Sequence, residues 1–208
     1  MGDWVRMKPA AVYPLEEAEP HCRSEASRRL ARAYLAWREA AAGSVPRKNG
    51  LDLSRLGPVM EHMVLSAVTK PDKCVYRLAG EEMKARIGMN PVGRNYYEFV
   101  PPERLEQARR AMHMVIETPC GFRAEIDQRY SDGRSRRIEC LGLPLVSDEA
   151  GVDGFILFSD CEIGRATPGL KQGMLLGAQV VRRELIDIGF GVDETFEDIV
   201  AESSSPSS

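Results

Sequence analysis

The segment from residue 120 to 162 constrains this chain most, because it predicts three long antiparallel strands joined by short turns. The first strand, 121–130, alternates apolar and polar side chains with a period of two, which is typical of a strand with one buried face. The Asp132-Gly133 pair then supplies the positive φ angles of a tight hairpin turn. A return strand over 136–146 and a continuous apolar run over 154–159 complete an antiparallel sheet, whose last strand we expect to be covered on both faces.

The return strand changes its apolar parity at Gly142. The apolar residues before the change are Ile138 and Cys140, and those after it are Leu141, Leu143 and Leu145. A parity change at a glycine predicts a bulge or a local twist near Gly142.

Upstream of these strands, the sequence predicts two shorter strands, several short helices and one long helix. The strands are expected at 63–68 and 74–79, and the short helical segments at 54–62, 81–87 and 95–100. The long helix begins after Pro101-Pro102 and runs to about Glu117, because proline suits the first helical turn. We therefore expect residues 62–163 to form one domain.

A helical extension, residues 24–61, precedes this domain. Ser24 is a helix cap and Gly43 a stop signal for a helix over 24–42, whose apolar stripe includes Tyr34 and Trp37. The stripe requires a partner surface, either the sheet of the same chain, which we favour, or the same helix of a second chain.

The two ends of the chain are expected to pack less well. Residues 1–23 contain three prolines and predict a flexible arm, and residues 191–208 predict a disordered acidic and serine-rich tail. Between the domain and the tail, residues 164–190 contain apolar side chains at helical spacing over 170–188, which predicts a C-terminal helix.

Composition limits the class of function. A net charge of −3 with mixed signs gives no global reason to bind nucleic acid, and no apolar run predicts membrane insertion, so a cytoplasmic protein is expected. The cysteines are widely spaced and favour reduced, buried thiols. Nucleophile, phosphate-cradle and metal-ligand motifs are absent, so we expect a protein that is not an enzyme.

Three local matches, in this order, resemble a PAS domain: Tyr76-Arg77-Leu78-Ala79-Gly80, the 92–99 segment, and the hairpin at Asp132-Gly133. With Trp37, Val45-Pro46-Arg47 and the 52–58 segment, the chain resembles bacterial single-PAS proteins with a helical N-terminal extension. The resemblance implies an α+β fold with a five-stranded antiparallel sheet, helices on one face, and flanking N- and C-terminal helices.

The resemblance also implies a non-enzymatic sensory or regulatory protein that binds a small ligand or a signalling protein partner. A homodimer that signals through the flanking helices is expected. Two alternatives stay open: a carrier or enzyme built on an α+β sandwich, and a structural adaptor without a ligand.

Seven residues are candidate ligand-binding positions. Five aromatic residues are expected to line an apolar pocket, although the same residues also suit a plain core: Tyr76, Tyr96, Tyr97, Phe99 and Phe158. Arg123 is a candidate polar anchor. His113 lies on the long helix, from which some haem-binding PAS domains supply an iron ligand, but an exposed or hydrogen-bonded histidine is favoured.

The cofactor is left unknown. The Asn-Cys-Arg motif of flavin-binding relatives is replaced by Gly93-Arg94-Asn95-Tyr96-Tyr97, so covalent flavin photochemistry is not expected. The basic segment 134–137 and the Arg182-Arg183 pair are interpreted as solvated faces.

Overall fold

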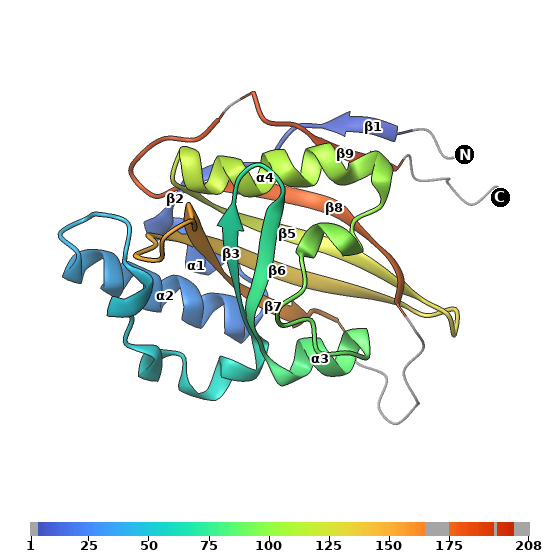
Figure 1. Ribbon diagram of the computed structural model, residues 1–208, viewed down its shortest axis with the longest axis horizontal. Helices are drawn as coiled ribbons and strands as arrows, with labels where there is room; N and C mark the ends of the chain where they lie inside the picture. Colours follow the sequence, from blue (N-terminus) through green and yellow to red (C-terminus); the bar gives the residue numbers. More distant parts are fainter. Residues whose placement is uncertain (1–3, 165–174, 194, 202–208) are drawn as a thin grey trace.

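A mixed sheet forms the centre of this protein in the computed structural model, which describes residues 4–164, 175–193 and 195–201 (Figure 1). Within these residues, seven strands join in the order β2-β8-β5-β6-β7-β3-β4. Their bounds are β2 Val12–Pro14, β3 Met63–Thr69, β4 Lys73–Ala79, β5 Cys120–Tyr130, β6 Ser135–Leu145, β7 Gly154–Glu162 and β8 Leu175–Asp187. The α+β class expected from the sequence is confirmed.

The five predicted strands are all confirmed, as β3 to β7. They pair antiparallel with one another, and β5 and β6 form the long hairpin expected around Gly133. Gly133 has φ +81° and its N–H donates to the carbonyl of Tyr130, 3.0 Å away. The Asp-Gly signal therefore identified a turn that needs a left-handed residue.

The prediction of a C-terminal helix over 170–188 is wrong, because residues 175–187 form the strand β8. Residues 170–174 of that prediction lie outside the described residues. β8 pairs with the whole of β5, from Cys120 opposite Asp187 to Tyr130 opposite Leu175. Strand β5 offers a row of backbone donors and acceptors that a helix would leave unpaired. Gly177 and the β-branched pair Val180-Val181 also lower the helix propensity of this segment.

The described residues near both ends of the chain are packed, which corrects the expected arm over 4–23 and the expected tail over 191–193 and 195–201. The rest of the expected arm and tail lies outside the described residues. The first residues form β1 Trp4–Met7, β2, the 3-10 helix η1 Leu15–Glu17 and α1 Ala18–His21. β1 pairs antiparallel with β9 Asp198–Ala201, above the main sheet in Figure 1. Leu15, Ala18 and Phe196 are fully buried, so apolar side chains anchor segments that composition alone presents as polar.

The helices agree closely with the sequence. They are α2 Glu25–Ala40, α3 Glu81–Ile87 and α4 Leu105–Glu117, with 3-10 turns η2 Lys48–Gly50, η3 Leu53–Arg55, η4 Gly57–His62, η5 Tyr96–Phe99 and η6 Pro102–Arg104. The Ser24 hydroxyl accepts the N–H of Ser27 at the start of α2, as expected of a cap.

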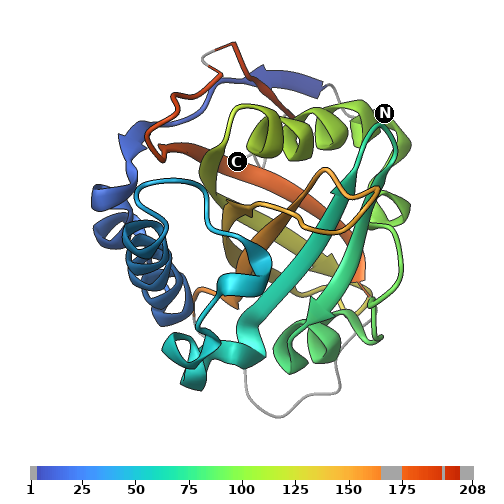
Figure 2. The same ribbon diagram turned by 60° about the vertical axis from the view of Figure 1, so that its left-hand side comes forward.

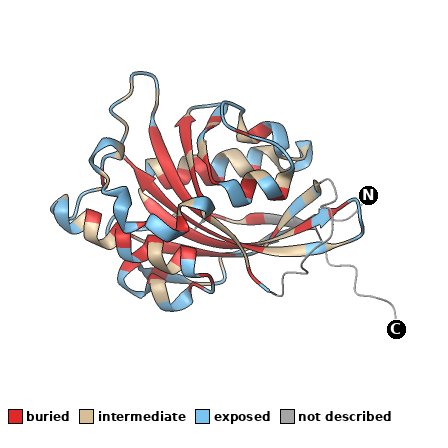
Figure 3. Ribbon diagram, turned by 90° about the horizontal axis from the view of Figure 1, so that it is seen from below, coloured by how far each residue is buried: buried red, intermediate tan, exposed pale blue. Residues whose placement is uncertain are grey.

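The helices α3 and α4 and the 3-10 helix η5 lie on one face of the sheet, as expected, and the N-terminal helix α2 covers the other face. Figure 2 shows α2 and α4 on opposite sides of the strands, and Figure 3 shows that the strands between them are buried. α2 packs with Leu141, Leu143 and Leu145 of β6. α4 packs with Phe122 of β5 on the other face. The apolar stripe of α2 therefore packs within its own chain, as favoured.

The expected bulge at Gly142 is also wrong. Strand β6 keeps its register through Gly142 with both neighbours, and Gly142 lies opposite Phe122 and Phe158. Both parities of β6 are apolar because both faces of the strand are covered. A Cβ at Gly142 would lie 2.5 Å from the Phe122 ring, so this glycine allows a close approach of aromatic side chains.

Candidate ligand cavity

A cavity of about 490 Å³ lies between the sheet and the layer made by α3, η5 and α4. This size falls within the usual range for small-molecule sites. Strand alternation directs Phe122 and Ala124 of β5 and Phe158 of β7 into it, and Met83 and Met112 come from the helices. Most of the wall is therefore apolar.

Aromatic rings form one part of this wall. The Tyr76 ring makes edge contacts with Tyr96, at 6.3 Å between centroids, and with Phe99, at 6.1 Å. Phe122 and Phe158 lie 5.9 Å apart. These spacings suit favourable aromatic packing, so the rings of the wall stabilise one another.

One polar group of the cavity consists of Arg183 from β8, Asp198 from β9, and Arg104 just before α4. Nε of Arg183 donates to Asp198 over 2.6 Å, and the guanidinium lies 4.8 Å from the Phe122 ring. Among the described residues, Arg104 donates one hydrogen bond, to the carbonyl of Ala178 at 3.4 Å. The Nη1 of Arg183 and the Nε of Arg104 are buried and have no hydrogen-bond partner within the described part of the chain.

A second polar group lies further along β5. Gln128 lines the cavity and accepts hydrogen bonds from Arg86, at 2.7 Å, and from the hydroxyl of Tyr130, at 2.7 Å. Arg86 also forms an ion pair with Asp160, which is another wall residue. The positive charge of Arg86 is therefore balanced by the carboxylate of Asp160 within this second polar group.

Apart from Arg104 and the members of these ion pairs, the tyrosine and cysteine side chains of the wall are neutral at physiological pH. Burial raises the pKa of the Tyr96 hydroxyl to about 12, and it raises the pKa of both the Cys74 and Cys140 thiols to about 12. All five cysteines are free. Protonated, buried thiols are poor nucleophiles, so the cavity is better suited to binding than to thiol chemistry.

Four of the seven candidate ligand-binding residues line this cavity: Tyr76, Tyr96, Phe99 and Phe158. Tyr97 is buried nearby and lies under the guanidinium of Arg109, 5.8 Å from its ring centroid. His113 lines a different hollow, with Arg109 and Glu117. His113 is therefore not placed to ligate a haem in the cavity, and the ligand-binding role of the other residues stays a prediction.

Arg123, the candidate anchor, lies on the opposite face of the sheet. It forms ion pairs with Glu139 at 2.7 Å, Glu125 at 2.9 Å and Glu184 at 3.0 Å, and all four residues are buried. Glu139 also accepts the backbone N–H groups of Arg23, at 2.8 Å, and Ser24, at 2.7 Å. Arg123 therefore anchors the start of α2 to the sheet rather than a ligand to the cavity.

Sequence reasoning missed Arg104, Arg183 and Asp198. Arg183 was interpreted as part of a solvated basic pair, but it is only 5% exposed. Arg183 pairs with Ala124 of β5, so its burial follows once residues 175–187 are recognised as a strand. The prediction of a helix here therefore missed this pairing.

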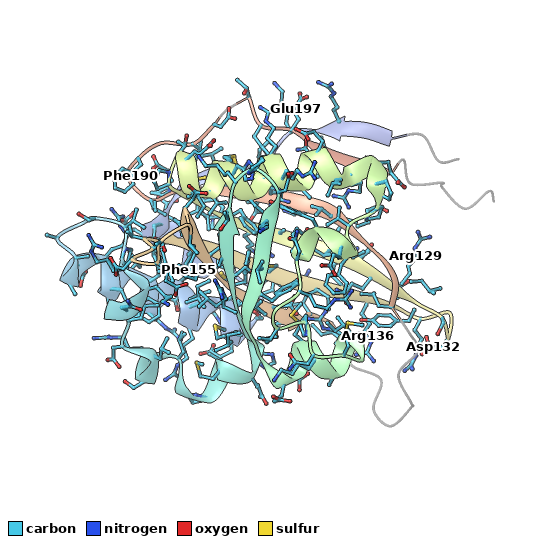
Figure 4. The ribbon with its side chains drawn as sticks, in the orientation of Figure 1. Arg129, Asp132, Arg136, Phe155, Phe190 and Glu197 are labelled. Atoms are coloured by element: carbon cyan, nitrogen blue, oxygen red, sulfur yellow. The ribbon has the colours of Figure 1, made fainter. Side chains whose placement is uncertain are left out.

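The basic segment 134–137 is only partly solvated, because Ser135 is exposed but Arg134, Arg136 and Arg137 are half-buried, which corrects the expected solvated face in part. It lies at the far tip of the β5–β6 hairpin, where Figure 4 labels Arg129, Asp132 and Arg136. Arg134 pairs with Asp132 at 2.9 Å, and Arg136 pairs with Glu162 at 2.7 Å. Local carboxylates thus balance this charge.

The described residues contain neither a candidate metal site nor a candidate membrane-spanning helix. No three His, Cys, Asp or Glu side chains gather there as a metal site would require. No helix among these residues is long and apolar enough to cross a membrane.

A family model described as a PAS domain matches residues 23–156, which is well over half of the chain. The chain therefore belongs to the PAS domain family. A sensory or signalling role in general accompanies this family.

The solved structures that are similar to this chain include PAS and light-oxygen-voltage domains. The PAS domain of a protein from Colwellia psychrerythraea is 13% identical, with a TM-score of 0.37, over 53% of this chain and 96% of that one. A fungal light-oxygen-voltage photoreceptor is 20% identical, with a TM-score of 0.39, over 67% of this chain and 95% of that one. No curated protein sequence matches this chain.

Proposed function

We propose that this protein is a non-enzymatic sensory or regulatory protein that binds a small molecule in the cavity and transmits its presence to α2 across the sheet. The observation that carries the proposal is the placement of neighbouring residues on β5. Phe122 and Ala124 line the cavity, and Arg123 between them holds the start of α2 through Glu139.

The cavity supports binding because it combines an apolar wall with few polar groups. A ligand that touches Phe122 or Ala124 would shift β5, and a shift of β5 moves Arg123 on the other face. Because Glu139 bonds both Arg123 and the first residues of α2, the helix start responds to the strand. The coupling requires that the ligand bind the two arrangements with different affinity.

The output is a contact made by α2, either with a second copy of this chain or with a signalling protein. The helix presents exposed charged residues outward, among them Glu25 and Arg32. The expected C-terminal helix is not available as a second output element, since residues 175–187 belong to the sheet.

Native mass spectrometry of the freshly purified full chain tests ligand binding. We expect an added mass that is released on denaturation. The variant Ala111→Phe, which fills the cavity wall, should lose that mass, and Ala40→Phe, at the exposed end of α2, should keep it. Equal bound mass in both variants would place the ligand elsewhere, and absence of any added mass would favour the ligand-free adaptor.

Hydrogen exchange tests the coupling. The amides of Arg23 and Ser24 donate to Glu139, so their exchange rates report on the α2 anchor. Loading the cavity should change these rates, whereas the amides of the β3–β4 turn should serve as an internal control. Unchanged rates at Arg23 and Ser24 in the loaded protein would refute transmission to α2.

A further inference from the structure

The geometry points to a ligand with a single carboxylate head group, held by Arg183 and Arg104, and with an apolar body against the aromatic wall. This inference rests on the proposed function and names the chemical class of the molecule that the cavity takes. Three observations carry it.

The first observation is the charge balance of the Arg104, Arg183 and Asp198 group. Two guanidinium groups and one carboxylate line this part of the cavity. Arg183 is paired with Asp198, whereas Arg104 has no carboxylate within 4.0 Å among the residues described. Arginine stays protonated in proteins, so one positive charge is left without a counter-ion.

The second observation is the pair of unused donors. Arg183 is 5% exposed, and its Nη1 lacks an acceptor within the described ranges, as does the buried Nε of Arg104. Buried N–H groups normally have a partner, because an unsatisfied donor is costly. The oxygens of an anion that bridges Arg183 and Arg104 would satisfy both donors with charge-assisted hydrogen bonds.

The third observation decides between classes of anion. One unbalanced positive charge matches a monoanion, and the carboxylate of Asp198 repels the second charge of a phosphate dianion. The rest of the wall is aromatic and aliphatic, including Tyr96, Phe99 and Phe158. A molecule with one carboxylate and an apolar body fits both parts of the cavity, and a neutral apolar molecule would leave the two donors unsatisfied.

Calorimetric titration of the full chain, washed free of small molecules, tests the inference with two matched pairs of probes. The pairs are 4-phenylbutyrate with 4-phenylbutanol, and decanoate with decanol. We expect the acid of at least one pair to bind at least about tenfold more tightly than its alcohol, as is typical of a hydrogen bond to a charged group.

Two variants change the charge in opposite directions. Arg104→Gln should weaken binding of the acid by about tenfold and leave the alcohol unchanged. Asp198→Asn keeps an oxygen for Nε of Arg183 but removes the competing charge, so it should tighten binding of the acid. Arg109→Gln is the matched control, because Arg109 lies on α4 but lines the other hollow, and it should change neither affinity.

The outcomes separate this inference from the proposed function. Equal affinity for acid and alcohol would overturn the carboxylate head group and leave cavity binding intact. Failure of all four probes to bind would overturn the inferred ligand class, whereas cavity binding itself is decided by the added mass of the freshly purified chain. If Arg104→Gln does not fold, the Asp198→Asn variant decides, and unchanged or weaker binding of the acid in that variant counts against the inference.

Discussion

Arg123 and Glu139 form an ion pair that is buried beneath the start of α2, with 2.7 Å between Nε of the arginine and Oε1 of the glutamate. Glu139 is fully buried and accepts two backbone N–H groups at the entrance to α2, besides the arginine. One carboxylate therefore joins β5, β6 and the N-terminal helix.

Glu139→Gln should destabilise the protein by about 3 kcal/mol, since breaking a buried ion pair leaves the partner charge uncompensated. Urea unfolding measures the change in the free energy of unfolding. Glu25→Gln, which alters an exposed ion pair on α2, is the control and should change the free energy of unfolding far less, because solvent screens exposed ion pairs. Equal costs for the two variants would show that the buried pair does not stabilise the fold.

Stability should fall in acid. Burial acts to raise the pKa of Glu139, but the N–H groups of Arg23 and Ser24 and the side chain of Arg123 outweigh it and hold the pKa below its ordinary value of 4.5. A carboxyl group with a lowered pKa in the folded state contributes stability above pH 4.5, and this contribution is lost as pH falls through the folded pKa. Glu125 and Glu184 act in the same direction.

The measurement is urea unfolding of the wild type and of Glu139→Gln between neutral pH and acid. The wild type should lose stability as pH falls below about 4.5, and the variant should lose less over the same range. Parallel curves would mean that Glu139 does not contribute to the acid transition.

Gly142→Ala should destabilise the protein by about 1–3 kcal/mol, because the new Cβ would lie 2.5 Å from the Phe122 ring and 3.0 Å from Phe158. Gly50→Ala is the matched control, since nothing lies within 4 Å of a Cβ at that position. Thermal unfolding distinguishes the two. A Gly142→Ala protein as stable as the control would show that the two rings move aside freely.

Two tyrosine substitutions separate a paired hydroxyl from an unpaired one. The hydroxyl of Tyr34 donates to the carbonyl of Pro144 at 2.7 Å, whereas the buried hydroxyl of Tyr97 has no partner among the residues described. Tyr34→Phe should therefore cost about 1–3 kcal/mol in the free energy of unfolding, because it leaves a buried acceptor unsatisfied. Tyr97→Phe should be neutral or stabilising, and the opposite order would contradict the hydrogen-bond assignment.

Much of the fold was predictable because its signals are local. Alternation over 121–130, the Asp132-Gly133 turn and the cap at Ser24 are each set by neighbours in sequence, and the structure confirms the strands, the turn and the helix they predict. The PAS resemblance rested on the order of such local elements, and it is confirmed by the family match.

The candidate site was only partly predictable. The aromatic wall was accessible from sequence, because large apolar residues at strand ends and in η5 face the core. The polar group was not, because Arg104, Arg183 and Asp198 come from three separate segments of the chain. Their charges meet only once β8 and β9 are in place.

The sequence by itself determined the local elements, since backbone propensity, capping and turn chemistry act over a few residues. Tertiary structure alone decided that Leu175–Asp187 is a strand, that Gly142 lies under two rings, and that Arg123 is turned away from the cavity. The physical reason is that edge pairing, burial on two faces and buried ion pairs all depend on partners far away in the chain. The cavity belongs to this second group, because its walls exist only between packed layers.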